Sequence, residues 1–174
     1  TADFFTYAYT KFMGFNSTTL RFANFYGPGQ QLYRIIPKTI MCILNQKKLN
    51  LEGGGKSKRS FIYSDDFCEG ILLTIKNGKK NETYNFSPNS EIKIIDLVKQ
   101  ICKLMKYPPE KLINFSKDRI GKDSRYYMSS KKAAKELKWK NQINLKDGLI
   151  ETIKWYRLNF YKLKKLNQNY IHKK

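Results

Sequence analysis

Histidine is almost missing from this 174-residue chain, and its cysteines are few and far apart. The one histidine, His172, lies near the C-terminus, and Cys42, Cys68 and Cys102 form no C-x-x-C pair. A zinc site or a cysteine–histidine catalytic pair therefore has nothing to build from. Each cysteine falls in an apolar stretch with helical character, so we expect buried free thiols. Reduced thiols are typical of cytoplasmic proteins, and we expect this location.

Long apolar runs and a secretory leader are also missing. No stretch approaches the ~18 apolar residues that a membrane-spanning helix needs, so the sequence excludes a transmembrane protein and predicts no membrane partner. The first residues, Thr1 to Phe5, show neither the basic region nor the cleavage pattern of a signal peptide. No methionine begins the chain, and we expect it to be part of a longer polypeptide.

Acidic residues are scarce, because 14 Asp and Glu stand against 34 Lys and Arg and give a net charge of +20. Such an excess is compatible with nucleic-acid binding. However, 28 of the 34 basic residues are lysines spread along the chain, which is typical of a solvated surface. Nucleic-acid binding is therefore the weaker hypothesis.

The few arginines are more informative than the lysines. Arginine differs from lysine by a planar fork that holds a phosphate through two parallel hydrogen bonds. Of the six arginines, four are predicted in loops or at element ends: Arg34, Arg59, Arg119 and Arg125. They are candidates for an anion site, and structural ion pairs are the alternative for each of them.

Helices and short strands are predicted to alternate along the chain, which defines the α/β class. Hydrophobic residues make up 41% and charged residues 28%, which is typical of a globular domain and excludes a disordered chain. Asp65 or Asp66 is predicted to cap the third helix, and Ser129 or Ser130 the fifth. The predicted helices cover residues 1–13, 35–44, 66–78 and 95–106, a stretch over Ala133, Ala134 and Leu137, and about 146–160. The predicted strands cover 18–24, 49–52, 59–63, 83–86 and 112–115.

The order of short motifs resembles one known family over about residues 1–160. The series is Arg21-Phe-Ala-Asn-Phe-Tyr-Gly-Pro28, Arg34-Ile-Ile-Pro37, Gly53 with Arg59-Ser-Phe-Ile-Tyr-Ser-Asp-Asp66, Tyr84-Asn85, Asp118-Arg-Ile-Gly-Lys-Asp123 with Arg125-Tyr126, Glu136-Leu-Lys-Trp139 and Trp155-Tyr156. It resembles the C-terminal portion of the extended short-chain dehydrogenase/reductase (NAD-dependent epimerase/dehydratase) family. The dTDP-glucose 4,6-dehydratases look most similar.

The resemblance implies a division of the chain. Residues 1–30 would be the end of the NAD-binding Rossmann-like domain and its parallel sheet. Residues 31–160 would be mainly the small α/β nucleotide-sugar-binding domain, with returns to the Rossmann sheet, and residues 161–174 a basic tail. The family's catalytic Tyr-x-x-x-Lys pair is expected upstream of Thr1. Tyr7 and Lys11 match this pattern by letter, but they lie too close to the strand of Arg21 to be that pair.

The resemblance also implies a binding site. Asn24 would lie beside the nicotinamide of NAD and the sugar nucleotide. Arg34 would lie on the nucleotide side, at a position where the dehydratases usually have Lys. Leu49 to Leu51 would line the base. The pyrophosphate would be held by Arg59, Asn85 and Arg119. The sequence departs from the family pattern at Phe25 (usually Asn), Ser60 (usually Asp) and Lys122 (usually His).

The function implied is that of an NAD-dependent nucleotide-sugar 4,6-dehydratase, a lyase of sugar-nucleotide biosynthesis. An NDP-sugar epimerase of the same family is the alternative, and a regulatory or structural protein with this fold is a further one. The resemblance implies a homodimer for the full-length protein. Without the glycine-rich NAD loop, residues 1–174 alone are expected to be inactive.

Overall fold

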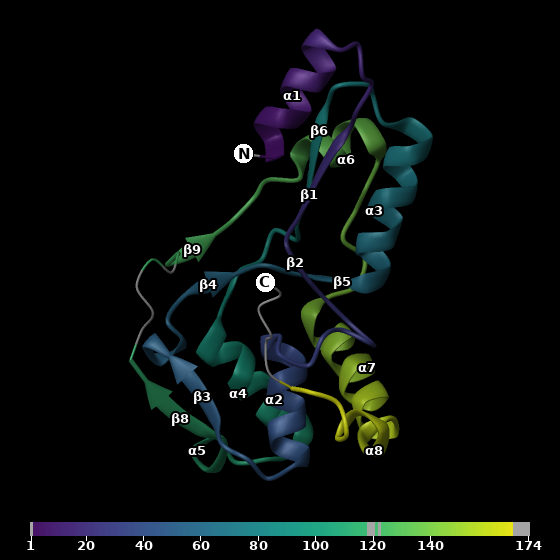
Figure 1. The fold of residues 1–174 in the computed structure, drawn as a ribbon. Coiled ribbons are helices and arrows are strands. Elements are labelled where there is room, and N and C mark those ends of the chain that lie inside the picture. Colours follow the sequence, from purple (N-terminus) through teal and green to yellow (C-terminus); the bar gives the residue numbers. More distant parts are fainter. Residues whose placement is uncertain (1, 118–120, 122, 169–174) are drawn as a thin grey trace.

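The computed structural model describes residues 2–117, 121 and 123–168 (Figure 1). The helices are α1 (Ala2–Phe12), α2 (Ile35–Leu44), α3 (Ser64–Asn77), α4 (Ile94–Met105), α5 (Pro109–Leu112), α6 (Lys131–Leu137), α7 (Leu145–Leu158) and α8 (Phe160–Leu163). The strands are β1 (Thr19–Phe22), β2 (Asn24–Tyr26), β3 (Leu49–Glu52), β4 (Lys58–Arg59), β5 (Phe61–Tyr63), β6 (Thr83–Phe86), β7 (Ile92–Lys93), β8 (Ile113–Ser116) and β9 (Arg125–Tyr126). The predicted α/β class is confirmed, and α5, α8, β7 and β9 are additional elements.

Most of the strand pairs are parallel, as the alternation of helices and strands predicts. Strand β1 pairs with β6, β2 with β5 and β3 with β8, all in parallel, while β4 lies between antiparallel β7 and parallel β9. The predicted strand 18–24 is divided at Ala23, whose N–H donates to the carbonyl of Phe86, whereas the next N–H, that of Asn24, donates to Ser60. The chain therefore changes its sheet partner within a single residue.

Two hydrophobic clusters form the core. The larger one joins α2, α4 and α7 with β3, and the smaller one lies under β1, β6, α3 and α6. In Figure 1, β1 and β6 lie at one end of the molecule and β3 and β8 at the other, with α7 alongside β5. Helix α4 shows the predicted amphipathic pattern, because Leu97, Val98, Ile101, Cys102 and Met105 are all buried.

Helix α7 approaches strands β2 and β5 through a glycine. A Cβ atom at Gly148 would lie 2.2 Å from the Tyr26 hydroxyl and 2.8 Å from the Tyr63 ring. The same Tyr26 hydroxyl donates a hydrogen bond to the carbonyl of Leu145, 3.3 Å away. Burial raises the pKa of Tyr26, so the hydroxyl remains a donor. The helix therefore packs at a distance that only glycine permits.

At the starts of α3 and α6, one of the two side chains predicted as caps binds a distant partner instead. Helix α3 begins after Tyr63 without a side-chain cap, because the Asp66 carboxylate points elsewhere and accepts the N–H groups of Gln142 and Ile143. At α6 the Ser130 hydroxyl donates to the carbonyl of Ser87, while the hydroxyl of Ser129, the other predicted cap, accepts the N–H of Lys131 at the start of the helix over 3.4 Å. In both cases a partner distant in sequence offers a buried hydrogen bond that a local cap does not.

The prediction of three buried thiols is only partly correct. Cys102 is buried and Cys42 is half-buried, but Cys68 is exposed. Helix α3 presents Cys68 to solvent because its buried face is formed by Asp66, Gly70 and Thr74. Within the described residues no helix combines the length and hydropathy needed to cross a membrane, and no three His, Cys, Asp or Glu side chains gather into a metal-binding group.

The close approach at Gly148 predicts the effect of one added methyl group. Gly148→Ala should lower the free energy of unfolding by about 2–3 kcal/mol, because the methyl group overlaps the Tyr26 hydroxyl and the Tyr63 ring. Urea unfolding measures the loss. Adding Tyr26→Phe to this variant should recover part of it, since the phenylalanine lacks the overlapping oxygen. A Gly148→Ala variant as stable as the wild type would contradict the packing.

The buried carboxylate of Asp66 predicts a second effect. Asp66→Asn replaces one acceptor oxygen by an NH₂ group that faces backbone N–H donors, so unfolding should become easier by about 1–3 kcal/mol. The neighbouring Asp65→Asn, on an exposed carboxylate, is the matched control and should change stability little. If thermal unfolding were equally affected in both variants, the Asp66 clamp would not be a stabilising interaction.

Candidate functional site

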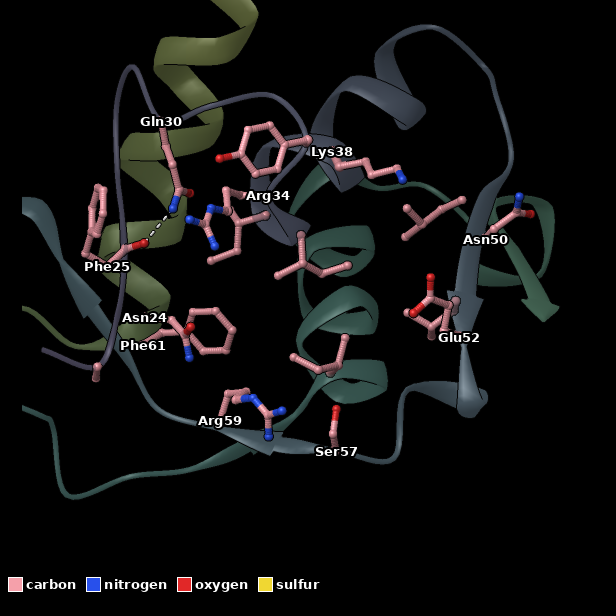
Figure 2. Close-up of a pocket in the computed structure, with 17 residues that line it drawn as sticks. Asn24, Phe25, Gln30, Arg34, Lys38, Asn50, Glu52, Ser57, Arg59 and Phe61 are labelled. Carbon is pink, nitrogen blue, oxygen red and sulfur yellow. Dashed lines mark hydrogen bonds between the residues drawn. The ribbon is translucent and has the colours of Figure 1, made fainter. Parts of the chain in front are cut away.

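An open pocket of about 740 Å³ lies between β2, α2, β3, β4 and the start of α4 (Figure 2). It brings together segments that are far apart in the sequence. The lining residues are Ala23, Asn24, Phe25, Gln30, Tyr33, Arg34, Ile35, Ile36, Lys38, Leu49, Asn50, Leu51, Glu52, Ser57, Arg59, Phe61 and Ile94. The wall is mixed, with apolar rings and chains beside three cationic side chains, which is typical of a site for a small organic anion.

Most of the predicted site residues meet in this pocket. Asn24, Arg34, Leu49, Leu51 and Arg59 all line it. Asn85 does not: it pairs with Arg21 in the β1–β6 ladder, and its amide oxygen is buried without a hydrogen-bond partner. Arg119 and Lys122 lie outside the described residues.

The alternative of a structural ion pair applies to Arg125. Its guanidinium binds both carboxylate oxygens of Glu91, at 2.8 Å and 2.5 Å, and lies over the Tyr127 ring. This hydrogen bonding lowers the pKa of Glu91. Arg125 does not line the pocket, so of the two alternatives given for each arginine the structural ion pair applies here.

Tyr7 and Lys11 lie together but away from the pocket. The Lys11 ammonium donates to the Tyr7 hydroxyl over 3.0 Å along the exposed face of α1. Neither residue lines the pocket, and α1 lies at the opposite end of the molecule from β3 (Figure 1). The hydrogen bond raises the pKa of Lys11.

Arg34 and Lys38 lie one turn apart at the start of α2. Residues four apart share a helix face, so both side chains project toward the same pocket. Arg34 caps the helix with extended backbone angles, and its guanidinium lies 5.2 Å from the centre of the Tyr33 ring. Figure 2 shows the Arg34 guanidinium extending into the space above Asn24 and Phe61.

Arg59 enters the pocket from β4. Two of its N–H groups donate over 2.7 Å to the carbonyls of Lys58 and Asp123, which fixes the plane of the guanidinium. The remaining N–H groups can donate to a ligand. Arg34 and Arg59 thus present the geometry that binds phosphate oxygens in pairs.

The turn between β3 and β4 depends on a glycine. Gly55 has a φ of +65°, and a Cβ atom there would lie 2.7 Å from the Leu51 side chain and 2.9 Å from the Ile95 nitrogen. This close approach seats β3 against the first turn of α4, where the Ile94 N–H donates to the carbonyl of Ser57 over 3.0 Å. Strands β3 and β4, on the two sides of the turn, therefore both face the pocket.

Strand β3 carries the residues that were predicted to line the base of the nucleotide. Its side chains alternate, so Leu49 and Leu51 point into the core, 1% and 3% exposed, while Asn50 and Glu52 are exposed. All four residues line the pocket. A ligand reaching this strand thus meets polar side chains and strand backbone before it meets the leucines.

Several lining residues were missed by the sequence analysis: Gln30, Lys38, Glu52, Ser57 and Phe61. Helix periodicity from Arg34 could have found Lys38, and strand alternation from Asn50 could have found Glu52. Alternation from Arg59 along the predicted strand 59–63 could have found Phe61 in the same way. Gln30 and Ser57 have no such signal, because the tertiary fold alone brings them to the pocket.

The sequence of this chain is similar to those of nucleotide-sugar dehydratases. A family model described as GDP-mannose 4,6 dehydratase matches residues 1–152. The chain is 33% identical over 172 residues to the dTDP-D-glucose 4,6-dehydratase of Homo sapiens, covering 96% of this chain and 49% of that protein. It is 34% identical over 164 residues to the probable dTDP-glucose 4,6-dehydratase of Sinorhizobium fredii, covering 91% and 47%. The chain thus spans about half the length of these relatives.

Solved structures agree with the sequence comparison. The dTDP-glucose 4,6-dehydratase DesIV of Streptomyces venezuelae, with NAD and TYD bound, superimposes with a TM-score of 0.89 at 29% identity, covering 92% of this chain and 50% of that one. The UDP-glucose 4-epimerase of Thermotoga maritima, at 24% identity and a TM-score of 0.82 over 91% and 51%, shows the shared fold alone. The chain belongs to the GDP-mannose 4,6 dehydratase family within the extended short-chain dehydrogenases/reductases.

Proposed function

We propose that this protein acts as an NAD-dependent nucleotide-sugar 4,6-dehydratase in sugar-nucleotide biosynthesis. The observation that carries the proposal is the meeting of Asn24, Arg34 and Arg59 in one pocket of about 740 Å³. This volume falls within the roughly 300–1,000 Å³ of small-molecule sites. The dTDP-glucose 4,6-dehydratases among its relatives support both the reaction and the substrate class.

The positive wall of the pocket supports a pyrophosphate ligand. Arg34, Lys38 and Arg59 surround a space whose only acidic lining residue among those described is Glu52. We assign the phosphate oxygens to the two arginine forks and the nucleoside to β3. The sugar then lies toward Asn24 and Phe61, where an apolar ring and an amide meet.

NAD is the proposed cofactor, since DesIV and the Bacillus anthracis dTDP-glucose 4,6-dehydratase were both crystallised with NAD. When bound, NAD would supply the acceptor for a hydride from C4 of the sugar and would donate that hydride back once water has left across C5–C6. Asn24 fits the nicotinamide side of the site. Its Nδ2 donates to the carbonyl of Ser60, which leaves its amide oxygen to accept a hydrogen bond. The sequence holds no glycine-rich G-x-G-x-x-G loop, so we assign no further NAD contact to this chain.

We further propose a cytoplasmic homodimer for the full-length protein. Free thiols at Cys42, Cys68 and Cys102 support a reducing compartment. The exposed aromatic side chains of α1, among them Phe4 and Phe12, support a protein contact on this face. A nucleic-acid partner has less support, because the lysines are scattered and the cationic side chains of the pocket surround a volume that suits a small ligand.

Product analysis tests the proposed reaction directly. The natural full-length protein, incubated with NAD and separately with UDP-, dTDP- and GDP-sugars, should convert one of them to a product lighter by one water molecule. Mass spectrometry and NMR identify a 4-keto-6-deoxy sugar. A product of unchanged mass with inverted C4 would instead establish an epimerase, and no turnover of any nucleotide-sugar would refute the proposal.

Substitution of Arg59 tests the phosphate assignment. Arg59→Ala in the full-length protein should weaken nucleotide-sugar binding by about 1.5–3 kcal/mol, the scale of a charge-assisted hydrogen bond. Lys79→Ala and Lys164→Ala, which remove exposed charges outside the pocket, are the controls and should change binding little. Titration calorimetry measures all three, and equal losses would show that overall charge, not a site, binds the ligand.

A further inference from the structure

One wall of the pocket has no regular secondary structure. Residues 27–34 connect β2 to α2, and Gln30, Tyr33 and Arg34 in this segment line the pocket. Leu32 fixes the segment to the core, since it is buried in the larger cluster. Because no ladder or helix hydrogen bonds hold residues 27–33, their position depends on such individual contacts.

One of these contacts comes from α7. Tyr156 is fully buried, and its hydroxyl donates to the backbone carbonyl of Gln30 over 2.5 Å. Burial raises the pKa of Tyr156, so the hydroxyl stays protonated and remains a donor. The two residues lie 126 positions apart in the sequence, and this bond therefore joins α7 to the pocket wall.

Further hydrogen bonds connect the residues of this segment with one another. The Gln30 side chain donates to the carbonyl of Phe25 over 2.6 Å, across the turn that follows β2 (Figure 2). The Arg34 N–H donates to the carbonyl of Gln31 over 3.1 Å, and the Arg34 carbonyl accepts the Lys38 N–H at the start of α2. Gln30 and Gln31 are adjacent, so the contact from Tyr156 lies one residue away from the backbone bond that holds Arg34.

We propose that Tyr156 is a positioning residue of the pocket: its hydroxyl holds Gln30 in place and thereby orients Arg34 toward the phosphates of the ligand. This inference rests on the proposed nucleotide-sugar function for the identity of the ligand. It gives the buried Tyr156 of the Trp155-Tyr156 motif a role in binding, beyond its packing in the core.

Tyr156→Phe is the central test, because it removes the hydroxyl and keeps the ring. The matched control is Tyr26→Phe, which also removes a buried hydroxyl that donates to a backbone carbonyl, that of Leu145 in α7, outside the pocket. In the full-length protein, the Kd for the nucleotide-sugar or its nucleoside diphosphate should rise about 3- to 10-fold in Tyr156→Phe. In Tyr26→Phe it should change less than about twofold. Equal Kd values for Tyr156→Phe and the wild type would overturn the inference.

A double-mutant cycle with Arg34 separates positioning from general loss of structure. If Tyr156 acts through the guanidinium, Tyr156→Phe should cost no further affinity once Arg34→Ala is present. If the fold loss of affinity in the double variant equals the product of the two single losses, Tyr156 does not act through Arg34. That result would overturn the inference. Melting temperatures, measured in parallel, should fall by similar amounts in Tyr156→Phe and Tyr26→Phe, although only the first loses affinity.

Hydrogen exchange tests the same inference without a ligand. Amides of residues 27–34 should exchange faster in Tyr156→Phe than in the wild type or Tyr26→Phe, because their tie to α7 is lost. Unchanged exchange would count against the positioning role. A wild-type protein that binds no nucleotide-sugar would refute the proposed function, whereas this exchange comparison would still decide whether Tyr156 holds the wall.

Discussion

The close packing of α7 against β2 and β5 is the constraint on which the rest of the structure depends. Gly148 brings the helix into contact with the Tyr26 hydroxyl and the Tyr63 ring, where any larger residue would push it outward. From the same helix, Tyr156 reaches the carbonyl of Gln30. Since Leu149 and Ile153 of α7 belong to the larger core cluster with α2 and α4, one helix fixes the parts of the molecule that enclose the pocket.

The pocket lies beside the point where the chain changes sheet partner. At Ala23 the backbone leaves β6, and at Asn24 it begins to pair with the β5 segment through Ser60. That change brings Asn24 to the surface between two parallel pairs, and it brings Arg59, the neighbour of Ser60, to the same place. Backbone pairing, rather than side-chain attraction, therefore positions these two polar groups together.

Local sequence patterns predicted the elements well and their long-range partners poorly. The helix at 35–44 and the strands at 49–52 and 83–86 have the bounds that were predicted, because apolar periodicity and glycine breaks are local signals. The division of residues 59–63 into β4 and β5 was not predicted, since it depends on β7 and β9 arriving from later in the chain. Asp66 was expected to cap its own helix, but it binds backbone amides more than 70 residues away.

For the site, too, local sequence patterns identified candidate residues but did not identify their partners. Arginine at Arg34 and Arg59, in a chain that otherwise uses lysine, indicated an anion site, and both residues line the pocket. At Arg125 the alternative of a structural ion pair applies, because a planar fork serves a structural carboxylate such as Glu91 as well as a phosphate. What distinguishes the two uses is the surroundings. Arg125 has both carboxylate oxygens of Glu91 within its reach, whereas the Arg59 fork is fixed by backbone carbonyls that carry no net charge, so its own positive charge remains for a ligand.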